Sequence, residues 1–369
     1  MTKTTWTILH TEWSDGWGGQ ERRIVSEMAG MAARGHRMIL ATRPQAQIVA
    51  HAQAAGVEVI TLPFQGKFEL ATIRPLMALI RQQQVDIVNT HSGKDSWSGG
   101  LAAWRAGCCL VRTRHLNIPL RRSWHNFIHR LPAAIVTCGD TMRQQLISNG
   151  FPPAQLVNIP TGIDFTAFQP RRTRAEVRAA LGVSETAPVV LMTGVIRAVK
   201  RHEIALRAFA QVLARYPQAM LLLAGDGPMR RDMEALVQQL GLGQQVRFLG
   251  HREDVPDIMA AADYALLTSR SEGVPQAVTQ GLGLGLPTVA TAVGGVPELI
   301  QHERTGLLAT PEDENAVAEQ LLRLLADPAW ARELGRAGQQ HVLQEFSLTA
   351  MLDKTEALYA RLLAQRKSR

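Results

Sequence analysis

The sequence has few cysteines, few aromatic residues and no long apolar run. Its three cysteines, Cys108, Cys109 and Cys138, match neither a disulfide framework nor a Cys-x-x-Cys metal spacing, so we expect buried free thiols in a reducing compartment. Aromatic residues make up 5% of the 369 positions, so aliphatic side chains must build the cores. No run of about 18 apolar residues and no signal-peptide pattern is present, which predicts a cytoplasmic protein.

Positive charge is concentrated in the first half of the chain. Residues 1–165 contain 17 Lys and Arg against 10 Asp and Glu, whereas the remainder contains 23 against 22. This imbalance favours an anionic partner for the first half, such as a phospholipid surface, an anionic glycolipid or nucleic acid. Nucleic acid is the weakest of these, because the chain has no recognition motif and no basic patch interleaved with aromatics. A chance drift of surface charge is the alternative explanation.

Short apolar runs alternate with longer amphipathic segments along the chain. Helices are predicted at 19–34, 69–84 and 348–366, among others. Strands are predicted at 5–10, 37–42, 57–63, 86–91, 108–115, 133–138 and 156–159, and again at 189–193, 219–224, 246–249, 264–267 and 287–291. This alternation predicts an α/β protein with two parallel sheets. We expect an N-terminal domain at 1–165, a C-terminal domain at 166–347 and a final helix, 348–369, that crosses back onto the first domain.

Glycine-rich and basic loops follow the first strand of each half, at the sheet edge where parallel sheets bind ligands. Gly18 and Gly19 precede a helix whose N-terminus favours an anion, although a plain tight turn fits equally well. Arg197 and Lys200 lie near the start of another helix and can bind a diphosphate. A solvated surface is the alternative for this pair.

A third loop carries an acid. Glu272 follows the strand at 264–267 and precedes a helix, and Gln280 lies about two helical turns further on. Glu272 is expected to face a sugar and Gln280 a ribose; capping of the helix by Glu272 is the alternative. The backbone groups expected to point at the same ligand belong to Gly273, Val274, Pro275 and Gln276.

One basic segment has apolar residues at helical spacing. These are Trp124, Phe127, Ile128 and Leu131, with Arg121, Arg122 and Arg130 beside them. The pattern predicts a helix that either packs on its own sheet or rests on an anionic membrane surface.

The second half resembles glycosyltransferase family 4, the large retaining group 1 family. The matching segments are 223–228, 246–250, 254–256, 261–264, 271–275, 285–291, 294–300 and 306–308; the first half matches more loosely at 18–19, 34–36, 89–91 and 159–164. The resemblance implies a GT-B fold, with two Rossmann-like lobes facing a central cleft. It also implies that the N-terminal lobe binds the acceptor and the C-terminal lobe binds a nucleotide sugar.

The resemblance further implies roles for individual residues. Lys200 matches the family's diphosphate-binding lysine, and Glu272 matches the first acid of its Glu-x7-Glu motif, which faces the donor sugar. His115 matches a histidine near the reacting sugar, and Gly18 and Gly19 match a loop near the phosphates.

Two positions depart from the family pattern. The second acid of the motif is Gln280, and the arginine that usually follows the strand glycine is Val195. Arg197 is the expected substitute for that arginine.

No Asp-x-Asp motif occurs, so Arg197, Lys200 and a helix N-terminus are expected to stabilise the leaving diphosphate without a metal ion. By resemblance, transfer retains the anomeric configuration through front-face attack. The expected donor is a UDP-hexose, with GDP-mannose second. The expected acceptor is a glycan or glycolipid of bacterial lipopolysaccharide or surface polysaccharide, reached from the cytoplasmic face of the inner membrane. The alternatives are a GT-B sugar-nucleotide epimerase or hydrolase, and a protein that binds nucleotide sugars without turnover.

Overall fold

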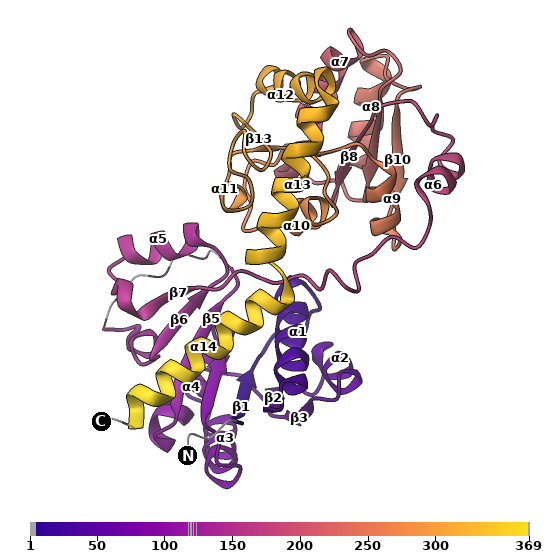
Figure 1. Cartoon of the computed structure of the whole chain (residues 1–369). Helices are drawn as coiled ribbons and strands as arrows, with labels where there is room; N and C mark the ends of the chain where they lie inside the picture. The colour runs from indigo at the N-terminus through magenta and orange to yellow at the C-terminus, as the bar shows by residue number, and fades with distance from the viewer. Residues whose placement is uncertain (1–4, 117, 119, 121, 123, 368–369) are drawn as a thin grey trace. The chain divides into compact units, whose positions relative to one another are not determined.

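The computed structural model describes residues 5–116, 118, 120, 122 and 124–367. It divides into two compact units: unit 1 is Met1–Gly162 with Leu348–Arg369, and unit 2 is Ile163–Ser347. Each unit holds one all-parallel sheet covered by helices (Figure 1). The predicted α/β class with two Rossmann-like sheets is confirmed. In the described residues, no helix is both long enough and apolar enough to span a membrane.

Unit 1 contains a seven-stranded sheet in the order β3-β2-β1-β4-β5-β6-β7. Its strands are β1 (Thr7–Thr11), β2 (Arg37–Thr42), β3 (Glu58–Thr61), β4 (Ile87–Thr90), β5 (Cys109–Arg114), β6 (Ala134–Thr137) and β7 (Leu156–Asn158). Its helices are α1 (Gly19–Ala33), α2 (Ile48–Ala54), α3 (Leu70–Gln82), α4 (Asp95–Ala106), α5 (Asp140–Ser148) and α14 (Leu348–Lys367), with short 3-10 helices η1 (Phe127–Arg130) and η2 (Pro153–Gln155).

Both faces of this sheet are apolar because each strand is covered on two sides. Successive residues of a strand point to opposite faces, so Ile8 and Leu9 of β1 belong to different core clusters. The Ile8 cluster also takes in Met351 and Tyr359 of α14, and α14 packs against α1. The last helix of the chain is therefore part of the core of unit 1.

Unit 2 contains a six-stranded sheet in the order β10-β9-β8-β11-β12-β13. Its strands are β8 (Val189–Thr193), β9 (Met220–Ala224), β10 (Val246–Gly250), β11 (Tyr264–Leu267), β12 (Thr288–Thr291) and β13 (Leu307–Ala309). Its helices are α6 (Arg174–Ala180), α7 (His202–Leu213), α8 (Arg230–Gln239), α9 (Val255–Ala261), α10 (Gln276–Gly283), α11 (Val296–Leu299), α12 (Glu314–Ala326) and α13 (Pro328–Glu345), with the 3-10 helix η3 (Ala198–Lys200). Strand β13 is absent from the predicted set.

The helix predicted around 120–131 is wrong. The described residues of this segment form only the four-residue 3-10 helix η1. Ile128 is buried and packs over Gly100 of α4, whereas Trp124 is 75% exposed, so the apolar residues do not share one face. Arg121, one of the predicted flanking cations, lies outside the described residues.

Candidate functional site

Unit 2 brings Lys200 and Glu272 together at the carboxyl ends of two neighbouring strands. Lys200 ends the loop after β8, and Glu272 lies in the loop after β11, which pairs with β8. Lys200 Nζ is 2.7 Å from Glu272 Oε1, and the two side chains are only 14% and 11% exposed. The Ser269 hydroxyl donates to the same oxygen at 2.5 Å. Two residues that are 72 positions apart in sequence thus form one partly buried ion pair.

Backbone contacts fix the loop that carries Lys200. The Thr268 hydroxyl contacts the carbonyl oxygens of Lys200 and Arg201 at 3.1 and 2.9 Å, and the Arg270 N–H donates to the Val199 carbonyl at 2.8 Å. Arg201 adopts a positive φ of 54° immediately before α7. The turn that aims Lys200 is therefore held from the β11 side.

Two glycines allow the neighbouring loops to approach this site. Gly225 follows β9 with φ 151°, and a Cβ there would lie 1.9 Å from the Gly194 carbonyl oxygen. Gly294 follows β12 with φ 53°, and a Cβ there would lie 1.8 Å from the Glu272 carbonyl oxygen. Any side chain at either position would push the site loops apart.

The other predicted residues of unit 2 lie around this pair. Arg197 is exposed directly before η3, and Gln280 is half-buried on α10. Val195 is 50% exposed. Pro275 is buried and has no N–H, so the expectation of four backbone donors before α10 is wrong. Only Gly273, Val274 and Gln276 can donate there.

Gly18 and Gly19 lie in unit 1, at the start of α1. The Glu21 carboxylate accepts a hydrogen bond from the Gly18 N–H at 2.8 Å, so this helix N-terminus already has an anionic cap. A Cβ at Gly19 would meet nothing within 4 Å, so packing does not require glycine there.

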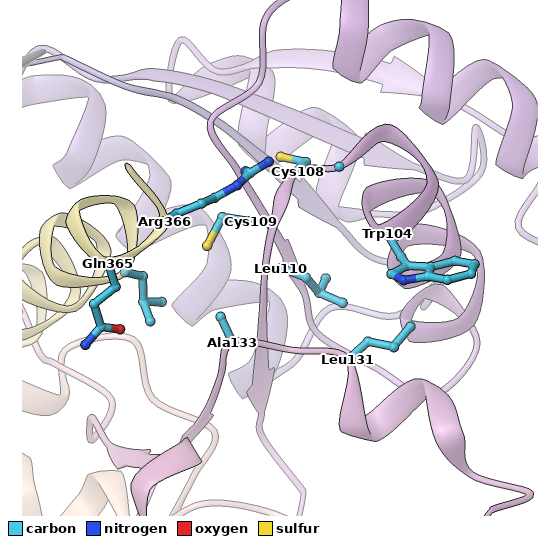
Figure 2. A pocket seen from close by; sticks show the side chains of 10 residues that line it. Trp104, Cys108, Cys109, Leu110, Leu131, Ala133, Gln365 and Arg366 are labelled. Atoms are coloured by element: carbon cyan, nitrogen blue, oxygen red, sulfur yellow. The ribbon is translucent and has the colours of Figure 1, made fainter. Parts of the chain in front are cut away.

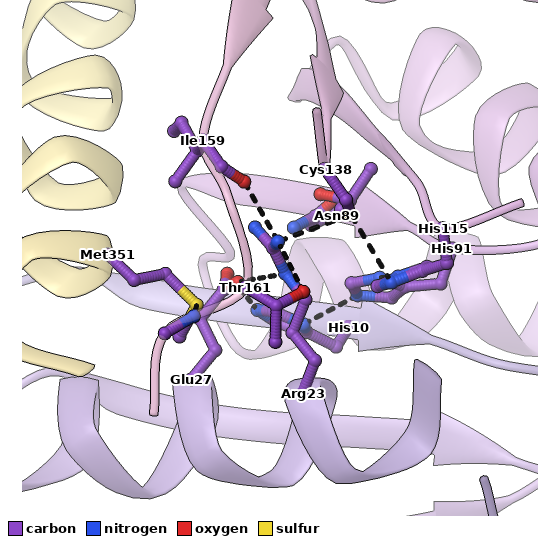
Figure 3. Close-up of polar contacts among 12 residues, drawn as sticks. His10, Arg23, Glu27, Asn89, His91, His115, Cys138, Ile159, Thr161 and Met351 are labelled. Atoms are coloured by element: carbon purple, nitrogen blue, oxygen red, sulfur yellow. Dashed lines mark hydrogen bonds and ion pairs between the residues drawn. The ribbon is translucent and has the colours of Figure 1, made fainter. Parts of the chain in front are cut away.

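His115 belongs to a row of three histidines at the carboxyl ends of adjacent strands. His10 lies in β1, and His91 and His115 directly follow β4 and β5. His10 Nδ1 is 2.8 Å from His91 Nε2, and His91 Nδ1 is 2.9 Å from His115 Nε2 (Figure 3). Burial is the main cause that lowers the pKa of all three, to about 3 for His10. The rings are therefore neutral at physiological pH.

Neutral rings in such a row must share one direction of hydrogen bonding, since each carries a single N–H. In one state the row donates outwards and ends with His115 Nδ1 directed at the Cys138 sulfur, 3.7 Å away. In the other it donates inwards and ends with His10 Nε2 directed at Glu27 Oε1, 4.0 Å away. The tautomer of His115 is thus coupled to the surroundings of His10.

Arg23 and Glu27 of α1 close the inner end of the row. Arg23 donates to the Ile159 carbonyl at 2.8 Å and to the Thr161 hydroxyl at 3.1 Å (Figure 3). Burial raises the pKa of Glu27, while the nearby charge of Arg23 acts in the opposite direction. Tyr359 of α14 donates to Glu27 at 3.4 Å.

Two large cavities lie at opposite edges of the unit 1 sheet. The first, of about 470 Å³, lies at the amino end of β5, beside Cys108, Cys109 and Arg366 (Figure 2). The second, of about 460 Å³, lies at the carboxyl edge and includes His91 and His115. Only the second is at the edge where parallel sheets bind ligands.

Sequence reasoning missed His10, His91 and Ser269 as members of these sites. Histidines at the ends of three separate strands were the available signal, but the strand order that makes them neighbours is a property of the folded sheet.

The three cysteines are unpaired, and burial raises the pKa of each thiol. In the described part of the chain, no three His, Cys, Asp or Glu side chains form a group suited to a metal ion. The expected independence from metal stays a prediction.

Two family models match: "Glycosyltransferase Family 4" over residues 17–167 and "Glycosyl transferases group 1" over residues 173–341. Together the two models cover most of the chain, which therefore belongs to the group 1 glycosyltransferases of family 4 and is a glycosyltransferase.

Named relatives agree with this class. The chain is 31% identical over 198 residues to the N-acetyl-alpha-D-glucosaminyl L-malate synthase of Bacillus anthracis, a match that covers 54% of this chain and only 52% of that protein. It is 24% identical over 307 residues, 79% of each chain, to the UDP-Gal:alpha-D-GlcNAc-diphosphoundecaprenol alpha-1,3-galactosyltransferase of Escherichia coli. Anabaena HepE, solved in complex with UDP, shares the fold: 22% identity, TM-score 0.83, covering 96% of this chain and 100% of that one.

Proposed function

We propose that the chain transfers a sugar from a nucleotide diphosphate sugar to a glycan or lipid-linked acceptor, with retention and without a metal ion. Unit 2 would bind the donor and unit 1 the acceptor. The Lys200–Glu272 pair, 2.7 Å apart, carries the proposal. A lysine ammonium has three N–H donors, so Lys200 can hold Glu272 and still donate to a diphosphate.

Each group near the pair has a use in such a reaction. Cleavage of the glycosyl bond leaves negative charge on the diphosphate, which Lys200 and the exposed Arg197 would stabilise. In the part of the chain that the structure describes, Lys200 and Ser269 both donate to Oε1 of Glu272, which leaves Oε2 able to accept from a sugar hydroxyl. His115 would orient the donor sugar or support the acceptor. With no nucleophile assigned, retention would follow front-face attack, with the leaving phosphate taking the acceptor's proton.

For the donor we propose a UDP-sugar, with a GDP-sugar second. The HepE complex with UDP and the UDP-galactose named for the Escherichia coli relative support this choice. The same relative's acceptor is a diphosphoundecaprenol-linked sugar, which supports a lipid-linked acceptor. We infer a role in bacterial surface polysaccharide or lipopolysaccharide assembly.

Turnover with a panel of UDP- and GDP-hexoses and polyprenyl-linked acceptors tests the proposal. We expect a transferred product whose anomeric configuration, by proton NMR, equals that of the donor, at a rate unchanged by EDTA. Free sugar or an epimerised nucleotide from donor alone would favour the hydrolase or epimerase. Tight UDP binding without transfer would favour a binding protein, and restoration by Mn²⁺ after chelation would contradict metal independence.

We also propose peripheral contact between unit 1 and an anionic membrane. The excess of positive charge in residues 1–165 supports it, as do exposed apolar side chains of unit 1, among them Phe68, Leu116, Ile118 and Trp124. Flotation with vesicles tests it. Binding should require anionic lipid and weaken as salt rises, and equal recovery with neutral vesicles would contradict it.

A further inference from the structure

The cavity at the carboxyl edge of the unit 1 sheet, called here the anion cavity, is lined by cations and by no carboxylate. Its volume is about 460 Å³. Among the described residues, four cationic side chains line it: Lys67, Lys94, Arg112 and Arg114. Single surface lysines are common, but four cations that line one cavity without an acid leave its positive charge uncompensated.

The two arginines are buried. Arg112 and Arg114 are two residues apart on β5 and so point to the same face of the sheet; they are 5% and 7% exposed. Arg112 donates to His129 Nδ1, and Arg114 donates to the Ile118 carbonyl at 2.5 Å. The Nε atom of each is buried without a hydrogen-bond partner. Burial and the charge of Arg114 lower the pKa of Arg112 to about 9.

The nearby acids accept hydrogen bonds from groups other than these arginines. The Asp95 carboxylate accepts from the Thr11 hydroxyl and the His91 and Ser92 backbone, and the Glu12 carboxylate accepts from the Trp13 and Ser14 backbone and Gln20. Burial raises the pKa of both acids, to about 8 for Glu12, which weakens them as counter-charges. No ion pair links either arginine to an acid in the described residues, and the positions outside them carry no Asp or Glu.

The two lysines stand over aromatic rings at the same cavity. Lys94 Nζ is 4.2 Å from the centroid of the Trp13 ring, and Lys67 Nζ is 5.2 Å from that of Trp97. Such contacts hold an ammonium in place while leaving its N–H groups able to bind an anion. The cavity thus offers two buried guanidinium groups and two positioned ammonium groups.

We propose that the anion cavity binds a phosphate group of the acceptor. A phosphate ester carries up to two negative charges and three acceptor oxygens, which suits four cations better than a single carboxylate does, and arginine forks bind it in bidentate fashion. The inference rests on the proposed function, because it takes the donor to be bound in unit 2. It narrows the acceptor to a phosphorylated one, either a soluble sugar phosphate or a lipid-linked phosphate.

Calorimetry on the full chain tests the proposal with three probes: inorganic phosphate, glucose 6-phosphate and a short polyprenyl phosphate in detergent micelles. At least one probe should bind, at least tenfold more weakly in Arg114→Gln. Lys94→Gln, a change at an exposed position that should not disturb folding, should weaken binding about threefold. The matched control is Arg105→Gln, which removes an exposed cation of α4 at the far end of the helix and should leave affinity unchanged.

The pattern among probes identifies the source. Binding of the soluble phosphate ester supports a soluble acceptor, and binding of the polyprenyl phosphate alone supports a lipid-linked one. No binding of any probe, or equal weakening by Arg105→Gln and Lys94→Gln, would overturn the proposal. Titration of UDP into the unaltered chain and the same variants separates the two claims. If UDP binds but no phosphate probe does, only the anion cavity is rejected. If UDP does not bind the unaltered chain, the proposed function is rejected.

Discussion

Separate and combined replacement of Lys200 by Met and Glu272 by Gln measures what the ion pair contributes. The pair is 2.7 Å apart and its side chains are 14% and 11% exposed, so removal of one partner leaves a mostly buried charge without compensation. Each single change should lower the free energy of unfolding by about 1–3 kcal/mol. The double change should cost less than the sum of the two, by about 0.5–3 kcal/mol. Because Glu272→Gln keeps an oxygen that can accept from Ser269, this variant loses the negative charge but retains the hydrogen bond.

The assay is urea unfolding of the three variants, alongside sugar-transfer rates. Each single variant should lose well over tenfold in turnover, or more than about 1.4 kcal/mol of transition-state stabilisation. Glu303→Gln is the control, because it breaks an exposed ion pair with Arg323 at 2.5 Å, where water screens both charges, and it should change stability far less than either single variant. Strict additivity in stability, or near-normal rates in both single variants, would refute the reasoning.

Two further changes test the backbone and the histidine row. Gly225→Ala should lower the free energy of unfolding, measured in urea, by at least about 1–3 kcal/mol, because its Cβ would lie 1.9 Å from a carbonyl oxygen. Gly19→Ala, with open space around its Cβ, should have little effect. Equal losses of stability in the two variants would contradict the packing argument. Burial lowers the pKa of His10 to about 3, so below about pH 6.5 the unfolded chain binds a proton that the folded chain does not, and stability falls as the pH drops from 6.5 towards 3. His10→Gln should reduce the slope of the free energy of unfolding against pH by about 1.4 kcal/mol per pH unit. If thermal unfolding gives the same slope for the variant and the unaltered chain across this range, His10 titrates normally.

Most of the fold could be read from the sequence because the buried strands are continuous apolar runs. The predicted bounds of β2, β8 and β11 agree with the structure. Strand β13 was missed because three residues, Leu307–Ala309, make too short a run to stand out. The helix at 120–131 was wrong because spacing shows only that residues could share a face. Phe127 contacts Trp97 and Ile128 packs over Gly100, whereas Trp124 is exposed.

The site was predictable as a set of residues but not as an arrangement. Lys200 and Glu272 were chosen by motif, yet their contact depends on β11 pairing directly with β8, although β9 and β10 separate them in sequence. Arg112 and Arg114 lie in the segment 108–115, for which the sequence pattern predicts only a strand. Two cations at alternate positions of a buried strand are unusual, and that pattern was the signal for the anion cavity.

A crystal structure of the chain with a bound nucleotide diphosphate, UDP or GDP, tests the central claim most directly. The account predicts the diphosphate within hydrogen-bonding distance of Lys200 Nζ, with Glu272 on the side where the sugar would be attached. A nucleotide bound away from both residues would contradict it.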